Sequence, residues 1–199
     1  MAAIVLPVGH DLGAFHPGDG AAAVRQVRLG AEIVELSTEE FQVWSLAHGI
    51  PSGDTVSCTP ADLSSPLSSP DAVAALRDRG LLAEVTPDSA QRFAAAHRLL
   101  PLALGLGNTA EEPWLFSVGL LYQPLVMMTG ALFDLWQWAH LSPDLWLACR
   151  ESAEVATRAG ADDADVTDPA RVLAGALGSL HQLLVARVAC LDVRIEGVR

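Results

Sequence analysis

The sequence contains no lysine, so all twelve of its basic residues are arginines. A GC-rich coding sequence explains this better than avoidance of lysine modification, because alanine, glycine and leucine are also abundant. Cysteine is sparse, with only Cys58, Cys149 and Cys190 and no pair spacing among them, which is typical of a reducing compartment. Residues 1–8 lack the basic start and long apolar run of a signal peptide. We therefore expect a cytoplasmic protein.

No motif in the sequence carries a recognisable chemistry. Gly105-Leu106-Gly107 lacks the third glycine and the basic residue of a phosphate-binding motif, so we predict a turn before a strand. The aspartates from Asp162 to Asp168 lack the glycine and glutamate of a helix-loop-helix calcium site, which indicates a solvated acidic loop. His48 and His140 have no second ligand four residues away, and we interpret both as helix-terminal histidines that bond the last carbonyls. We expect no enzyme, no cofactor and no metal.

Charge is scarce and mostly negative. Charged residues make up 18% of the chain, and 24 acids against 12 bases give a net charge of −12. Affinity for nucleic acid grows with the number of phosphates that basic groups neutralise, so this balance argues against a nucleic-acid partner. The hydrophobic fraction of 51% indicates large cores, or apolar surface that a partner covers.

Residues 113–133 carry no charge and are numerous enough for a membrane helix. However, Gln123-Pro124 and Thr129-Gly130 interrupt the stretch, and the matching residues 24–41 of the first half are strongly charged. We therefore predict two strands and a helix start here, and no membrane span.

The sequence repeats itself. Phe41-Gln-Val-Trp44 returns as Phe133-Asp-Leu-Trp136, and Leu6-Pro7 returns as Leu100-Pro101. The repeat is too long for a solenoid unit and suits a small domain. The sequence therefore predicts an α+β fold of two tandem units related by internal duplication: unit 1 at 1–88, a linker helix at 89–99 and unit 2 at 100–199.

Within each unit, the pattern predicts strands followed by helices. In unit 1, glycines make the first twenty residues irregular, a hairpin follows over 24–36, and a capping box from Ser37 to Glu40 begins a helix. Three further segments are expected to be helical, beginning at Pro60, at Pro70 and at Asp88, the last running to Leu100, with a closing strand at 83–85. In unit 2 we expect strands at 114–118 and 120–127, helices beginning near residues 130, 143 and 169, and a final strand at 185–195.

Unit 1 also carries a pattern of core residues, namely Leu36, Phe41, Trp44, Leu46, Gly49, Leu76, Gly80, Leu81 and Leu82. This pattern resembles that of winged-helix domains, and most of all the PqqD-like peptide-recognition modules of that superfamily. The resemblance reaches unit 2 only through the repeat. It implies two winged-helix-like units, of which the first binds a peptide by strand addition beside its third helix. The implied surface includes Arg28, Ile33, Val73 and Arg77.

Aromatic residues gather in unit 2. Trp44 and Trp136 correspond in the repeat and are expected in the two cores, and Trp138 replaces Leu46. The remaining tryptophans have no aromatic counterpart. We predict an apolar contact between the units or between two chains, with core packing as the alternative, for four candidate residues: Trp114, Trp138, Trp146 and Tyr122.

These features together predict a non-enzymatic protein- or peptide-binding module that is homodimeric, with an acidic face that favours a basic partner. The alternative is a DNA-binding transcriptional regulator, because the third helix of a winged helix commonly reads the major groove. The expected third helices argue against it. The first carries Arg77 and Arg79 alongside two aspartates, and the second carries Arg171 alone.

Overall fold

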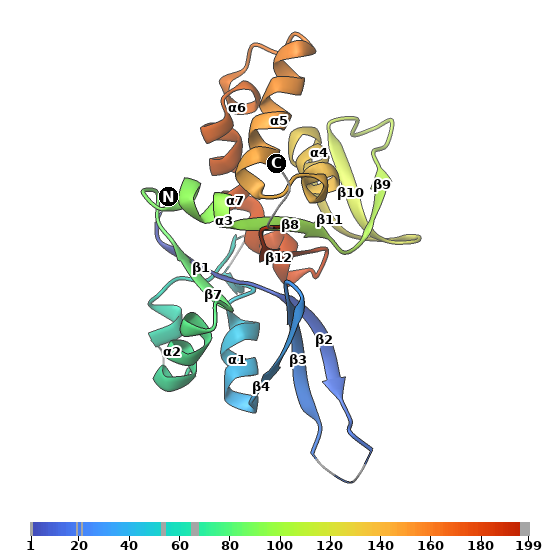
Figure 1. Ribbon diagram of the computed structural model, residues 1–199. Helices are drawn as coiled ribbons and strands as arrows, with labels where there is room; N and C mark the ends of the chain where they lie inside the picture. The colour runs from blue at the N-terminus through green and yellow to red at the C-terminus, as the bar shows by residue number, and fades with distance from the viewer. Residues whose placement is uncertain (1, 19, 21, 53–54, 65–67, 196–199) are drawn as a thin grey trace.

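The computed structural model describes residues 2–18, 20, 22–52, 55–64 and 68–195. Short helices and small antiparallel sheets fall into two groups, the N-terminal half in the lower part of Figure 1 and the C-terminal half in the upper part. The α+β class expected from the sequence is confirmed. Within the described residues, no helix combines the length and the apolar character needed to cross a bilayer.

The N-terminal half contains, in chain order, β1 (Ile4–Pro7), β2 (His10–Phe15), β3 (Val24–Leu29), β4 (Glu32–Leu36), α1 (Thr38–Leu46), β5 (Ile50–Ser52), β6 (Thr55–Ser57), the 3-10 helix η1 (Asp62–Ser64), α2 (Pro70–Asp78) and β7 (Leu82–Val85). Strands β2, β3 and β4 form an antiparallel sheet with β3 in the middle. β1 pairs with β7, and β5 pairs with β6.

Helix α3 (Ala90–Ala96) leads into the C-terminal half, which contains β8 (His97–Pro101), β9 (Leu104–Gly107), β10 (Leu115–Leu120), β11 (Gln123–Thr129), α4 (Gly130–Trp138), the 3-10 helix η2 (Ala139–Leu141), α5 (Leu145–Arg158), α6 (Ala164–Thr167), α7 (Pro169–Val185) and β12 (Ala189–Val193). Strands β9, β10 and β11 form an antiparallel sheet with β10 in the middle, and β8 pairs with β12. The hairpin of β10 and β11 turns at Leu121-Tyr122.

The two halves share part of their order of elements, although the β5–β6 hairpin follows α1 in the first half whereas helices α5 and α6 follow α4 in the second. In each, the first strand pairs with the last, and an antiparallel sheet is followed by a helix that buries a tryptophan. Helices α2 and α7, which precede the closing strands β7 and β12, end in the same way. After α2 the Leu81 N–H donates to the Leu76 carbonyl, and after α7 the Val188 N–H donates to the Leu183 carbonyl. Gly80 and its counterpart, the arginine at position 187, both have a positive φ.

Capping side chains fix where the helices begin. The Ser37 hydroxyl accepts from the Glu40 N–H while the Glu40 carboxylate accepts from the Ser37 N–H, so the predicted capping box of α1 is confirmed. Ser69 caps α2, and the Asp144 and Asp168 carboxylates cap α5 and α7. Each such cap contributes about 1 kcal/mol to stability.

Two clusters of buried residues form the core. Trp44 is fully buried in the N-terminal cluster, where its indole N–H donates to the Val8 carbonyl at 3.1 Å. Trp136 is 2% exposed in the C-terminal cluster and donates to the Val188 carbonyl at 3.0 Å. Strand β1 serves both clusters, because Val5 packs into the first and its neighbours Ile4 and Leu6 pack into the second.

A buried carboxylate joins the halves. Asp192 on β12 is fully buried, and its Oδ1 accepts from the Gly30 N–H of the β3–β4 turn at 2.7 Å. Its Oδ2 lies 3.7 Å from the Arg28 guanidinium of the N-terminal half and 3.7 Å from that of Arg98. A carboxylate held in this way ties β3, β8 and β12 into one body, because separating them would leave buried charge without a partner.

Several predicted boundaries are wrong for physical reasons. Residues 4–15, predicted irregular, form β1 and β2, because pairing with β7 and β3 overrides their glycines. The predicted helix of 88–100, including the 89–99 linker, ends at Ala96, and residues 97–101 form β8 because β12 pairs with them. Leu104–Gly107, predicted as a turn, is strand β9.

Smaller corrections concern the helices. The segment beginning at Pro60 forms only the 3-10 helix η1, and α5 begins at Leu145 rather than at Pro143. The predicted acidic loop contains the short helix α6, which the Asp163 carboxylate caps. Trp138 is the last residue of α4 and is 55% exposed, so core packing, the alternative for this residue, is wrong.

Candidate functional site

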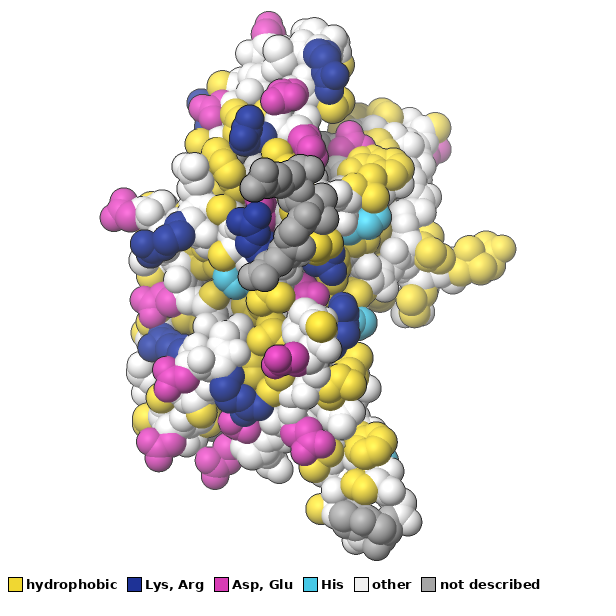
Figure 2. Space-filling view, in the orientation of Figure 1, with side chains coloured by type: hydrophobic (Ala, Val, Ile, Leu, Met, Phe, Trp, Pro, Cys, Tyr) yellow, Lys and Arg dark blue, Asp and Glu magenta, His cyan; other side chains and the backbone are white. Residues whose placement is uncertain are grey.

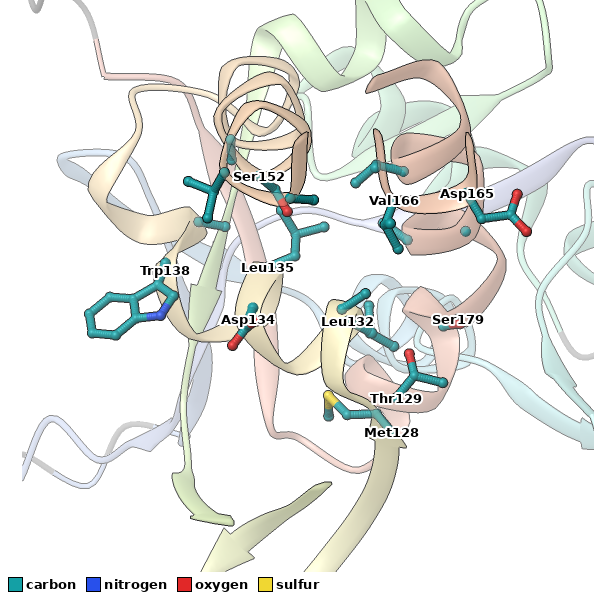
Figure 3. Close-up of a pocket in the computed structure, with 18 of the residues that line it drawn as sticks. Met128, Thr129, Leu132, Asp134, Leu135, Trp138, Ser152, Asp165, Val166 and Ser179 are labelled. Atoms are coloured by element: carbon teal, nitrogen blue, oxygen red, sulfur yellow. The ribbon is translucent and has the colours of Figure 1, made fainter. Parts of the chain in front are cut away.

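A groove of about 1420 Å³ opens in the C-terminal half between α4, α5, α6 and α7. Figure 3 shows side chains from all four helices around it. It exceeds the roughly 300–1,000 Å³ that is usual for a small-molecule site, so it has room for a peptide. The principal lining residues are Met127, Thr129, Leu132, Asp134, Leu135, Trp138, Leu141, Ser142, Ala148, Glu151, Ser152, Val155, Ala156, Ala159, Asp165, Val166, Arg171, Val172, Gly175, Ser179 and Gln182.

The helices line the groove with side chains of different size. Leu132, Leu135 and Trp138 lie on one face of α4, at helical spacing, and form the bulky side. The facing sides of α5 and α7 carry small residues, such as Ser152 on α5 and Gly175 on α7. Small side chains leave the hollow open, and a Cβ added at Gly175 would meet nothing within 4 Å.

Large apolar side chains are exposed around the groove. The exposed fractions of Met127, Trp138, Leu141 and Val155 are 50%, 55%, 70% and 57%. Single exposed apolar residues are common on proteins, but a contiguous set that lines one hollow is typical of a binding surface. Burying such side chains contributes about 25 cal/mol for each Å² of apolar surface removed from water.

The charged groups of the groove are mainly acidic, namely Asp134, Glu151 and Asp165 against Arg171. The Ser142 hydroxyl donates to the Glu151 carboxylate, and the Arg171 guanidinium pairs with Asp165 at 2.6 Å in an exposed position. Asp134 is exposed at the rim, and partial burial raises the pKa of its carboxyl. Among the described residues no hydrogen bond occupies this carboxylate, so it can serve as an acceptor, and the charge of the groove favours a neutral or basic occupant.

In the N-terminal half, the corresponding helices are in contact with each other. Helix α1 packs directly against α2, whereas α4 and α7 face each other across the groove. Arg79, at the end of α2, reaches Glu40 of α1 at 2.7 Å and donates to the Glu35 carbonyl of β4 at 2.7 Å. The bond to the Glu35 carbonyl uses one backbone acceptor of the edge strand β4, along which the predicted strand addition would take place. The groove itself lies in the other half.

The four residues predicted as a peptide-binding surface do not form one surface. Arg28 and Ile33 are opposite each other on β3 and β4, with Ile33 60% exposed, but the Arg28 guanidinium turns to Asp192. Val73 is 8% exposed in the N-terminal core, because the apolar face of α2 packs inward. Arg77 pairs with Glu84 of β7 at 2.9 Å.

The four predicted aromatic contact residues are also dispersed. Trp138 lines the groove, and Trp146 on α5 is half-buried against the C-terminal core. Trp114, which precedes β10, is 64% exposed, and Tyr122, at the hairpin turn, is 93% exposed. Tyr122 has a φ of 64°, which costs a non-glycine residue about 1–2 kcal/mol.

His48 and His140, which occupy equivalent positions in the repeat, both hydrogen-bond to backbone carbonyls near the end of a helix. The Nδ1 of His48 bonds the Trp44 carbonyl at 2.9 Å, and its Nε2 lies 2.8 Å from the Arg187 guanidinium, so the ring is neutral and accepts from the arginine. Burial, together with the charge of Arg187, lowers the pKa of His48 to about 3. His140 bonds the Gln137 carbonyl, as expected of a helix-terminal histidine. In the part of the chain that the structure describes, no three His, Cys, Asp or Glu residues gather as metal ligands.

Sequence reasoning did not find the groove. The signal that was available is the period of small residues along α5 and α7, visible at Ser152 and Ala156 and at Gly175 and Ser179. This pattern is equally typical of close helix packing, so it becomes informative only when no helix fills the space.

Comparison with protein-family models, with curated proteins and with solved structures finds no match to this chain. The fold and the groove therefore supply the argument for function.

Proposed function

We propose that this protein is a non-enzymatic protein- or peptide-binding module and that its binding site is the groove between α4, α5 and α7. The observation that carries the proposal is the volume of about 1420 Å³ lined by exposed apolar side chains. A hollow of this size suits a helix or a folded-back peptide better than a metabolite. Its lining residues include neither histidine nor cysteine, which favours binding over catalysis.

We further propose that the two halves are winged-helix-like units related by internal duplication. Three shared features support this: a first strand that pairs with the last around a three-stranded sheet, the buried tryptophan of α1 and α4, and the common ending of α2 and α7. The second unit then begins at His97 with β8, before the boundary at residue 100, and α3 connects the units. Arg79 and the α1–α2 contact close the site in the first unit, so the second unit takes over the binding role.

The charge of the groove indicates which segments it binds. Asp134, Glu151 and Asp165 lie on it, and its one arginine is paired with Asp165. Because the whole chain carries a net charge of −12, basic segments are attracted and acidic ones repelled. We therefore propose an apolar segment with at least one basic side chain as the preferred partner.

The alternative, a DNA-binding regulator, gains no support from the helices that would enter a groove of DNA. Seven residues of α7 are buried, and its Arg171 pairs with Asp165. On α2, Arg77 and Arg79 are held by Glu84 and Glu40. Arginines that are already neutralised contribute little to phosphate binding.

Selection from a displayed library of random peptides tests the proposal. We expect wild type to enrich apolar peptides that contain a basic residue. Gly175→Phe places a ring in the groove and should abolish enrichment. Gly178→Phe is the matched control, because Gly178 lies on the same helix, also has open space around an added Cβ and does not line the groove. Equal enrichment on both variants, or none on wild type, would contradict the proposal.

A further inference from the structure

We propose that the groove receives the β10–β11 hairpin tip of a second copy of this chain, so that two chains exchange tips. This inference rests on the proposed protein-binding function and names the segment that fills the groove in the purified protein. It also assigns a physical basis to the homodimer that the sequence predicts.

The hairpin tip is apolar and exposed. Its exposed apolar side chains are Leu120 at 54%, Leu121 at 65%, Tyr122 at 93% and Leu125 at 42%. In Figure 2, apolar side chains project at the right, where Figure 1 places the end of this hairpin. No charged residue occurs between 113 and 133.

The turn itself is costly in the isolated chain. Tyr122 holds a φ of 64°, a conformation in which glycine or asparagine is usual. A bulky aromatic residue that is both strained and almost fully exposed stabilises nothing within its own chain. Such an outlier points to a contact made elsewhere.

The tip cannot reach the groove of its own chain. Tyr122 lies at one end of β11, and Thr129, which lines the groove, lies at the other. A strand of this length separates its ends by about 20 Å, at about 3.3 Å for each residue. β10 and β11 pair up to Leu120 and Gln123 despite a bulge at Val118/Gly119, and Figure 1 shows the end of the hairpin projecting away from the helices, so a tip that enters a groove has to come from a second molecule.

The tip and the groove are chemically complementary. The groove is lined by apolar side chains of α4 and small residues of α5 and α7, and the tip supplies leucines and one aromatic ring. An uncharged tip avoids the repulsion that two chains of net charge −12 otherwise experience. The Tyr122 hydroxyl is a donor, and the exposed Asp134 carboxylate at the rim is an acceptor.

Reciprocal exchange buries enough surface for a stable dimer. The tip exposes roughly 500 Å², given about 150–250 Å² for an aromatic side chain and less for each leucine. Two tips in two grooves of similar area bury on the order of 2,000 Å², within the range of stable complexes. Since tip and groove lie on the same half of the chain, a two-fold axis can relate both contacts.

Sedimentation velocity across micromolar concentrations tests the inference. We expect wild type to dimerise and Leu121→Asp to raise the dimer dissociation constant on the order of 100-fold or more, because each contact loses a buried leucine and gains a charge near Asp134. Ile33→Asp is the matched control, since Ile33 is 60% exposed on the N-terminal half, and it should leave the dimer intact. Gly175→Phe should dissociate the dimer, whereas Gly178→Phe should not.

Mixing the Leu121→Asp and Gly175→Phe chains gives a result that misfolding of either chain could not produce. The Leu121→Asp chain keeps its groove, and the Gly175→Phe chain keeps its tip. Neither should dimerise alone, but the mixture should form a heterodimer with one intact contact. Circular dichroism should show both variants folded.

Four results would overturn the inference: a monomeric wild type, a dimer that survives Leu121→Asp or Gly175→Phe, a mixture without heterodimer, or an open series of larger oligomers. A monomeric wild type that still selects apolar peptides ends the inference and leaves the proposed function standing. A wild type that selects no peptide and forms a dimer insensitive to Gly175→Phe ends both.

Discussion

His48, a buried histidine between the two halves, should make the stability of the protein depend on pH. His48 is 5% exposed, and burial together with Arg187 lowers its pKa from 6.5 to about 3. In the unfolded chain the ring takes up a proton near pH 6.5, but in the folded chain it stays neutral. Acidification therefore favours the unfolded state from about pH 6.5 downward, and this loss continues until pH falls to the folded pKa.

The size of the loss follows from that difference in pKa. Between pH 7.5 and pH 5.0 the unfolded ring becomes almost fully protonated while the folded ring does not. Each pKa unit corresponds to 1.36 kcal/mol, so His48 alone lowers the free energy of unfolding by about 2 kcal/mol over this interval. Burial also lowers the pKa of His97 and of His181, so the wild-type loss is larger than this.

A variant without the His48 ring measures how much of the loss of stability at low pH is due to this histidine. The variant His48→Asn cannot titrate, so its loss of stability between pH 7.5 and pH 5.0 should be about 2 kcal/mol smaller than that of wild type. Urea denaturation at the two pH values measures both losses. The variant will also be less stable at pH 7.5, by about 1–3 kcal/mol, because the Trp44 carbonyl and the Arg187 guanidinium lose their partner. Equal pH dependence in the two proteins would show that protonation of His48 does not cause this loss of stability.

Three further expectations follow from the packing. Gly175→Ala and Gly178→Ala should each raise the free energy of unfolding by about 0.5–1 kcal/mol, because α7 loses a flexible residue and both sites have open space. Asp192→Asn should lower it by about 3 kcal/mol or more, since the charges of its arginine partners stay behind, whereas Asp165→Asn in an exposed pair should change it by less than about 1 kcal/mol. The three buried cysteines, whose thiol pKa values burial raises to about 12, should react with a thiol reagent only as fast as the protein unfolds. Urea titrations check the first two, and absorbance kinetics in native and denaturing buffer check the third.

Local signals in the sequence predicted the elements that local chemistry determines. The capping box of Ser37 and Glu40, the Ser69-Pro70 start of α2 and the Gly30-Ala31 turn are all found as expected. In each case the determining hydrogen bonds or backbone angles lie within a few residues of the signal.

Elements determined by distant partners were missed. Residues 97–101 follow directly on a helical segment without glycine or proline between them, and only pairing with β12 makes them a strand. The same holds for β1, whose partner β7 lies at the far end of the N-terminal half. Contacts of this range leave no mark in the local pattern.

The groove was not predicted from the sequence for a related reason. Ala and Gly at helical spacing on α5 and α7 indicate that something packs closely against them, but not whether it belongs to this chain. Trp138 and Tyr122 were singled out for their residue type, and the structure shows that the first lines the groove and the second lies at the hairpin turn. The exposure of each was not readable from the sequence.

We propose above all that this protein binds protein segments in the groove of its C-terminal half. The decisive measurement is isothermal titration calorimetry of a library-selected peptide, with wild type, Gly175→Phe, Gly178→Phe and Ile33→Asp in parallel. We expect binding with a negative heat-capacity change, as is usual when apolar surface is buried, to every protein except Gly175→Phe. Undiminished binding to Gly175→Phe, or a loss confined to Ile33→Asp, would contradict it and return the site to the N-terminal half.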